Sequence, residues 1–268
     1  MPSSAPPPPP AAPRRVEVER KFVPPPDLAR RVAALRGRRV LGPPPEETTS
    51  VEEITDAYWD VWPGDPGGVA LPLTTRDVWL RRRSAAGGRR RWEMKVPLEA
   101  GDRSGGETQV FEELEGATAV AAGLSPWLGE TRLDDEGDDE DEALAAALTA
   151  RGLAPLLVVR TVRTSWTLPL DDDDVRLDAD VAEVLVPATG PPCRAAVLEI
   201  ECLVGGEAEV PEARRRIARA AALLGAVPLG AEAGGKVETA LRATLPDVAA
   251  RLVAAGVLAP AAPGKKEG

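Results

Sequence analysis

Three charged side chains near the start of the sequence have the spacing of a metal and phosphate site. Glu17, Glu19 and Lys21 alternate with other residues in the segment VEVERKF, residues 16–22. Side chains alternate between the two faces of a β-strand, so these three charges would share one face. Two carboxylates about 7 Å apart beside an ammonium suit a divalent cation and a phosphate group. For this motif alone, a surface strand with a solvated charged face is the alternative.

The sequence contains no histidine among its 268 residues. This excludes Ser-His-Asp and Cys-His catalysis, and the zinc and iron sites that depend on imidazole. The two cysteines, Cys193 and Cys202, are too few for a disulfide framework or a thiolate zinc site. They fit a reducing compartment, and we predict a cytoplasmic location. A metal would need oxygen ligands, which favours Mg²⁺, Mn²⁺ or Ca²⁺.

The net charge of −10 comes from two acidic runs. Eight acids lie at 134–142 and four at 171–174, and the remaining 31 acids are balanced by 33 bases. We predict that 134–142 is a solvated loop. Because the acidity belongs to loops, it argues against a nucleic-acid-binding surface.

The composition predicts one folded domain over residues 14–257. The Pro/Ala-rich residues 1–13 contain no apolar stretch of the secretory type and are predicted to be a disordered leader, and residues 258–268 a disordered tail. No run approaches the eighteen or so apolar residues of a membrane span. We therefore expect no membrane contact, and we expect a monomer.

Alternation and turn residues predict eight strands. They cover residues 15–23, 52–61, 77–83, 90–97, 108–114, 156–168, 175–180 and 195–204. Helices are predicted after Asp27, within 117–153 on both sides of the acidic loop, from Pro211 to Gly225, and over 234–257 with a restart at Pro246.

Most of these strands pair one apolar file with a file of mixed charges. The charged files include Arg81 and Arg83, Glu93 and Lys95, Arg176 with Asp178 and Asp180, and Glu199 and Glu201. Amphipathic helices need apolar surface to cover, so the charged files would face one another inside a closed sheet. A barrel of about eight strands leaves room for one small ligand. An open sheet with a wet charged face is the alternative.

At this point the sequence resembles the triphosphate tunnel metalloenzymes, or CYTH domains. The signature of that family is E-x-E-x-K, and further segments are similar to its thiamine-triphosphatase branch. These segments are DAYWD (56–60), WLRRR (79–83), WEMK (92–95), FEEL (111–114), RTSW (163–166), RLD (176–178), EIE (199–201) and GK (235–236). They keep the family's order over roughly residues 15–245.

The resemblance implies an α+β fold, a closed eight-stranded antiparallel β-barrel with helices packed on the outside. It also implies that the barrel hydrolyses a triphosphate with Mg²⁺, or with Mn²⁺, and with no organic cofactor. By matching position, the metal ligands would be Glu17, Glu19, Asp178, Glu199 and Glu201. The phosphate-binding bases would be Lys21, Arg81, Arg83, Lys95, Arg163 and Lys236. Glu113 would orient these bases, or would simply neutralise them.

The same resemblance suggests how the substrate is chosen and how a proton moves. A lysine–tyrosine pair, here Lys95 and Tyr58, would act in proton transfer; alternatively, Lys95 is one more phosphate-binding base and Tyr58 a wall residue. Trp79 would bind the thiazolium ring of thiamine triphosphate through a cation–π contact. The alternative for Trp79 is simple burial. The other tryptophans are expected to be packing residues, namely Trp59, Trp62, Trp92, Trp127 and Trp166.

Three functions follow as hypotheses. The first is Mg²⁺-dependent hydrolysis of thiamine triphosphate to thiamine diphosphate and phosphate. The second is hydrolysis of inorganic triphosphate or a nucleotide by the same lining. The third, of another class, is a non-catalytic module that binds polyphosphate or a nucleotide.

Overall fold

The computed structural model describes ten stretches of the chain. They are residues 15–37, 49–62, 71–86, 88, 90–98, 108–129, 139–170, 173–187, 193–230 and 234–260. The predicted leader and nearly all of the predicted tail lie outside these residues. The described chain continues to residue 260, and Leu258, within the predicted tail, is buried in the core cluster of the last two helices.

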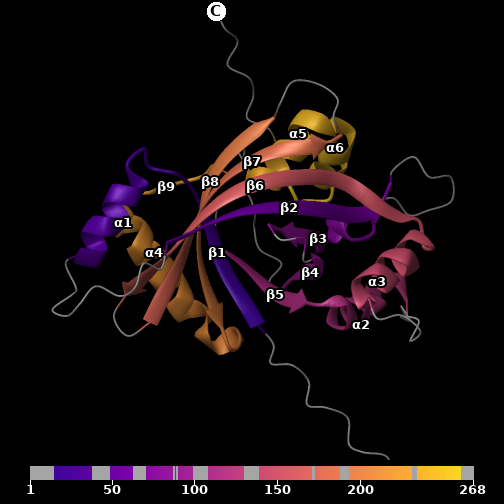
Figure 1. Ribbon diagram of the computed structural model, residues 1–268, viewed down its shortest axis with the longest axis horizontal. Coiled ribbons are helices and arrows are strands. Elements are labelled where there is room, and N and C mark those ends of the chain that lie inside the picture. Colours follow the sequence, from indigo (N-terminus) through magenta and orange to yellow (C-terminus); the bar gives the residue numbers. More distant parts are fainter. Residues whose placement is uncertain are drawn as a thin grey trace, which may run out of the picture.

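A closed antiparallel barrel organises the molecule, as predicted (Figure 1). Its sheet runs in the order β5-β4-β3-β2-β6-β7-β8-β1, and pairing of β5 with β1 closes it. The strands are β1 (Arg15–Val23), β2 (Thr49–Val61), β3 (Trp79–Ala85), β4 (Arg90–Pro97), β5 (Gln109–Glu115), β6 (Leu153–Leu170), β7 (Asp173–Val186) and β8 (Arg194–Val204). A two-residue strand that the sequence did not predict, β9 (Val227–Pro228), extends the sheet beside β1.

One strand boundary differs in a way that matters for the site. The predicted strand 77–83 begins at Trp79, because Asp77 has a left-handed backbone (φ 61°) and ends the 3₁₀ turn Thr74–Arg76. Strands β2, β6 and β7 are longer than predicted. Barrel strands continue through segments whose local pattern is weak, because pairing with both neighbours stabilises them.

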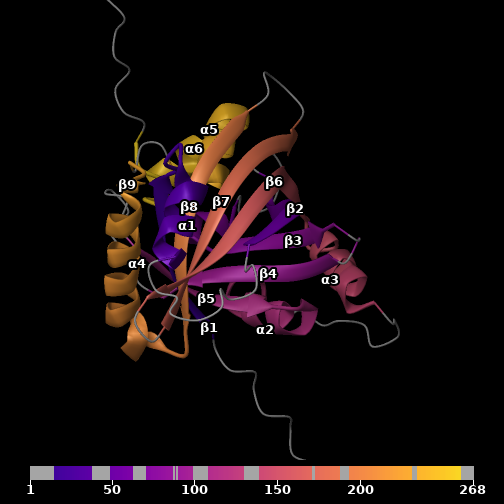
Figure 2. The same ribbon diagram turned by 60° about the vertical axis from the view of Figure 1, so that its left-hand side comes forward.

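Three pairs of helices cover the outside of the barrel (Figures 1 and 2). They are α1 (Leu28–Gly37) with α4 (Val210–Leu224), α2 (Ala117–Leu128) with α3 (Glu140–Thr149), and α5 (Lys236–Thr244) with α6 (Pro246–Ala254). Each pair shares a hydrophobic cluster with the strands below it. No helix in the described residues is both long and apolar enough to cross a membrane.

The predicted acidic loop 134–142 is partly helical. Residues 134–138 lie outside the described chain, but Asp139 caps α3 and the next three acids form its first turn. The Asp139 side chain accepts hydrogen bonds from the amides of Asp141 and Glu142. Acids at a helix N-terminus are favoured by capping and by the helix dipole, so this run starts a helix.

The apolar files face outward beneath the helices, and the charged files face inward. On β1, Val16 and Val18 belong to the cluster of α1 and α4, while Glu17 and Glu19 on the same strand are 3% exposed. The tryptophans pack as expected with one exception: Trp62, which follows the end of β2, is 43% exposed. The barrel therefore has a charged interior, which is costly unless the charges are paired or bind a ligand.

Candidate active site

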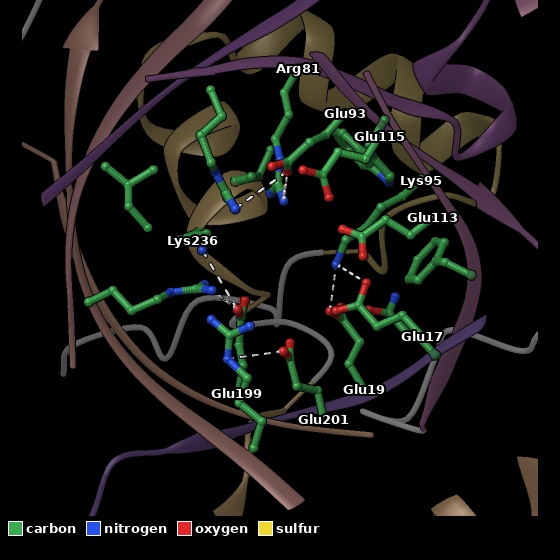
Figure 3. Close-up of a pocket in the computed structure, with 18 of the residues that line it drawn as sticks. Glu17, Glu19, Arg81, Glu93, Lys95, Glu113, Glu115, Glu199, Glu201 and Lys236 are labelled. Carbon is green, nitrogen blue, oxygen red and sulfur yellow. Dashed lines mark hydrogen bonds and ion pairs between the residues drawn. The ribbon is translucent and has the colours of Figure 1, made fainter. Parts of the chain in front are cut away.

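A cavity of about 260 Å³ occupies the inside of the barrel, and side chains from all eight barrel strands and α5 line it (Figure 3). Every predicted site residue except Asp178 lines this cavity. Asp178 is fully buried and is covered by the guanidinium of Arg163. The structure thus brings together residues that lie more than 200 positions apart in the sequence.

Glu17, Glu19 and Glu201 form an acidic triad on β1 and β8. One carboxylate oxygen of each lies within 4.8 Å of the others, and each side chain is buried. Burial, and then repulsion from the neighbouring carboxylates, raises the pKa of Glu17 despite the opposing charge of Lys95. Burial and Asp178 likewise raise the pKa of Glu201. For Glu19, burial is outweighed by Lys21 and Lys95, which lower its pKa.

The triad fits a divalent metal ion. Its ligand atoms are all carboxylate oxygens, which Mg²⁺ and Mn²⁺ prefer. Oxygen Oε2 of Glu17 accepts no hydrogen bond among the described residues, and its close contact is the ion pair with Lys95 at 2.6 Å. The raised pKa values of Glu17 and Glu201 show that too little positive charge surrounds these crowded carboxylates. A bound dication would supply it.

The other two predicted metal ligands contact bases. Oxygen Oδ2 of Asp178 pairs with Arg163, and Oδ1 accepts a hydrogen bond from Arg176 at 3.0 Å. Oxygen Oε2 of Glu199 accepts one from Arg163 at 3.0 Å and lies 3.7 Å from the ammonium of Lys236. Asp178 and Glu199 are paired across β7 and β8, next to Glu201 in the strand register. Their role as metal ligands stays a prediction.

Each predicted arginine of the phosphate site is held by a carboxylate that the sequence analysis did not assign to the site. Asp56 binds Arg83 through two hydrogen bonds of 2.8 and 2.9 Å. Asp180 binds Arg163 through two of 2.8 and 2.7 Å. Glu93 accepts a hydrogen bond from Arg81 at 2.7 Å. All three acids lie on the inward files, so alternation was a signal that could have identified them.

Glu113, predicted to orient the bases, does not lie among the carboxylates that bind the arginines. It lines the cavity and is paired with Lys95 in the register of β4 and β5. Among the described residues, no salt bridge of 4 Å or less joins it to a base. Asp56, Glu93 and Asp180 orient the arginines in the structure, and the role of Glu113 stays a prediction.

The sequence of this barrel also matches known proteins. A family model for the CYTH domain matches residues 15–227. The chain belongs to the CYTH family. Thiamine-triphosphatases from Macaca fascicularis and Homo sapiens are each 32% identical to it, over 243 and 245 residues, and the match covers 89% of this chain and 89% of each relative. The expected class, a triphosphate tunnel phosphohydrolase that uses a divalent metal, is thereby confirmed at the level of the family.

Solved structures give a more distant match. Two proteins from Pyrococcus horikoshii OT3 align with TM-scores of 0.48 and 0.42, each at 18% identity. The alignments cover 79% and 78% of this chain, and 92% and 90% of theirs.

In this CYTH chain the predicted Lys95–Tyr58 pair is not joined by a hydrogen bond in the described structure. The ammonium of Lys95 lies 2.6 Å from Glu17 and 2.9 Å from Glu19. Burial would lower the pKa of Lys95, but the two glutamates outweigh it and raise the pKa well above its usual value. Burial, and then Asp56, raises the pKa of Tyr58. Both groups are therefore protonated at neutral pH in this arrangement.

Trp79 lines the cavity beside these charges. Its indole meets the ring of Tyr58 edge to face, with centroids 6.4 Å apart and planes at 89°. It is paired with Lys95 in the register of β3 and β4, and it packs against the cluster that contains α5 and α6. An aromatic ring thus lies in the wall of the same cavity as the bases and the triad.

Proposed function

We propose that this CYTH chain hydrolyses thiamine triphosphate to thiamine diphosphate and phosphate with a divalent metal ion. The observation that carries the proposal is the indole of Trp79 in the wall of a cavity whose lining side chains are mostly charged. A thiazolium cation over an indole face is favoured by about 1–2 kcal/mol when it is desolvated. The names of the two relatives, both thiamine-triphosphatases, support the same substrate.

The bases suit the triphosphate chain. Six bases reach the cavity from four barrel strands and from α5: Lys21, Arg81, Arg83, Lys95, Arg163 and Lys236. Two of the arginines, Arg83 and Arg163, are fixed by paired hydrogen bonds to carboxylates, so little side-chain freedom remains to be lost when phosphate binds. Phosphoryl transfer depends mainly on positioning and charge neutralisation, and these six bases supply both.

The acidic triad would hold the metal, with Asp178 and Glu199 as the further proposed ligands. A divalent cation held by these residues would supply positive charge to stabilise the phosphates, and that charge would offset the glutamates that raise the pKa of Lys95. Lys95, with Tyr58, remains our proposal for proton transfer at the attacking water. Lys95 is suitably placed because it contacts two of the triad carboxylates.

Inorganic triphosphate or a nucleotide is the second candidate substrate, because most of the lining side chains are charged and do not depend on an organic group. A binding module without catalysis would need neither the triad nor its arrangement beside the bases. We place the reaction in the cytoplasm, where the free cysteines Cys193 and Cys202 would stay reduced.

Phosphate release on thiamine triphosphate, inorganic triphosphate and ATP, measured side by side with Mg²⁺ and with EDTA, tests the proposal. We expect the highest kcat/KM for thiamine triphosphate, and no activity in EDTA. Trp79→Ala should raise the KM for thiamine triphosphate about tenfold and leave that for inorganic triphosphate nearly unchanged. A wild-type preference for inorganic triphosphate or ATP would contradict the proposed substrate.

A further inference from the structure

A buried carboxylate, Asp60, holds the turn that precedes Trp79, and it has no basic partner among the described residues. Asp60, at the end of β2, is fully buried. Its oxygens accept hydrogen bonds from the amides of Val61 and Thr74, both at 2.8 Å, and from the Thr74 hydroxyl at 2.8 Å. Burial raises the pKa of Asp60, while these hydrogen bonds act in the opposite direction. Asp60 therefore fastens the turn to β2.

The turn itself, residues 71–78, is fixed along its length. Leu71 and Leu73 are fully buried, and Leu71 packs in the cluster of α5 and α6. The amide of Asp77 donates to the carbonyl of Thr74 at 3.0 Å, and that of Val78 to Leu73 at 3.1 Å. The position of Asp77 is thus set by β2 and by the α5–α6 pair, not by β3 alone.

Asp77 has an unusual backbone and a specific side-chain contact. Its φ of 61° is in the left-handed region, which costs most residues energy but which Asp, Asn and Gly tolerate. Its side chain is 3% exposed, and its Oδ1 accepts a hydrogen bond from Nε1 of Trp79 at 2.7 Å. The turn thus brings a carboxylate to the one polar atom of the indole.

This contact determines how the indole faces the cavity. A tryptophan side chain turns about two bonds, and a hydrogen bond at Nε1 removes the freedom of the outer one. The edge-to-face contact with Tyr58 constrains the ring from another side. A ring that is already oriented binds a flat organic group at a lower entropy cost than a mobile ring does.

We infer that Asp77 is a positioning residue for substrate specificity: it fixes the Trp79 indole as a preformed surface for the organic part of the triphosphate. The inference rests on the proposed function. It adds that specificity depends on a residue outside the charged lining, in a turn held by Asp60. A turn residue with only a structural role would affect all triphosphates alike.

Matched variants separate the hydrogen bond from the backbone. Asp77→Gly keeps the left-handed turn but removes the acceptor, whereas Asp77→Asn keeps both. Relative to wild type, Asp77→Gly should lower kcat/KM for thiamine triphosphate about tenfold, mainly through KM, and that for inorganic triphosphate less than twofold. Asp77→Asn should stay close to wild type on both. In a Trp79→Phe background, where the donor is absent, Asp77→Gly should have no further effect.

A second readout does not depend on the substrate. In a ¹H–¹⁵N spectrum of the protein labelled on its tryptophan indoles, Trp79→Phe identifies the Trp79 signal by its loss. Asp77→Gly should shift this signal and speed its hydrogen exchange, and Asp77→Asn should do so less.

The outcomes separate the two proposals. If wild type prefers ATP to thiamine triphosphate, the proposed substrate is wrong. The change that Asp77→Gly causes in the ratio of kcat/KM for ATP to kcat/KM for inorganic triphosphate then decides the role of Asp77. An enzyme that prefers inorganic triphosphate to both would overturn both proposals. Two results would overturn the role of Asp77. One is an equal loss of kcat/KM on all substrates in Asp77→Gly. The other is an unchanged ratio of kcat/KM between the organic and the inorganic triphosphate, together with an unchanged indole signal.

Discussion

Two walls of the same barrel handle buried charge in opposite ways. The acidic wall, on β1 and β8, carries Glu17, Glu19 and Glu201. Burial raises the pKa of Glu17 and of Glu201, and Lys95, which reaches them from β4, offsets this only in part. The paired wall, on β2, β3 and β4, joins Arg81 and Arg83 to Asp56 and Glu93. Burial there is outweighed by the arginines, which lower the pKa of Asp56 and bring that of Glu93 to about 2.

This difference suggests a division of labour. A wall whose charges are already matched is preorganised, and it can present the remaining N–H groups of its arginines to phosphate. A wall with excess carboxylate is stable only at a cost, which a bound cation removes. The predictions below test this division, and they include the opposite effects on stability that the pKa directions of Glu93 and Glu17 require.

The largest effect is expected from the acidic wall. Glu19→Gln removes a triad carboxylate and the partner of two lysines, and we expect it to lower kcat for Mg²⁺-dependent phosphate release at least about a hundredfold. Glu53→Gln, on the outward face of β2, is the matched control and should stay within about twofold of wild type. A Glu19→Gln enzyme with the wild-type rate would exclude the triad as the metal site.

On the paired wall we expect a loss of stability. The pKa of Glu93 is lowered from 4.5 to about 2, so its ionised form stabilises the fold by about 3 kcal/mol above pH 4.5. That contribution disappears as the pH falls from 4.5 towards 2. Glu93→Gln should therefore lower the free energy of unfolding by about 2–3 kcal/mol at pH 7 and by less at pH 3.5, as measured by urea denaturation. An equal loss at both pH values would show that packing, not charge, is responsible.

For Glu17 we expect a change in the free energy of unfolding that has the opposite sign and is smaller. Its raised pKa means that folding disfavours the ionised carboxylate, so Glu17→Gln should raise the free energy of unfolding at neutral pH in EDTA. The gain should shrink as the pH falls and the wild-type carboxyl becomes protonated. Urea denaturation of both proteins at pH 7 and pH 4.5 measures it. A destabilised Glu17→Gln protein would mean that the ion pair with Lys95 outweighs the crowding.

The sequence predicted the faces of the strands better than it predicted their partners. The two-residue period of Glu17, Glu19 and Lys21 is enough to place them on one face, and the structure puts them inside the barrel. The period contains no information on which carboxylate lies opposite which base, because that depends on strand register. Alternation could place Glu93 and Asp180 on inward files, but it could not show that they pair with Arg81 and Arg163 or that Arg163 covers Asp178.

The errors at segment ends have a local cause. The acidic run near residue 140 was interpreted by its charge alone, although Asp139 has the right type and place for a helix cap. Asp77 was assigned to a strand because the residues after it alternate. Its left-handed backbone depends on the turn that Asp60 holds through Thr74, a contact across 14 residues that no periodicity reveals.

Binding of Mn²⁺ tests the central claim, that the acidic wall is a divalent-metal site, most directly. Mn²⁺ can be followed by its electron paramagnetic resonance signal during titration of wild type, Glu19→Gln and Glu53→Gln. We predict tight binding by wild type and Glu53→Gln, and at least about tenfold weaker binding by Glu19→Gln. Equal Mn²⁺ binding by all three proteins would contradict the account.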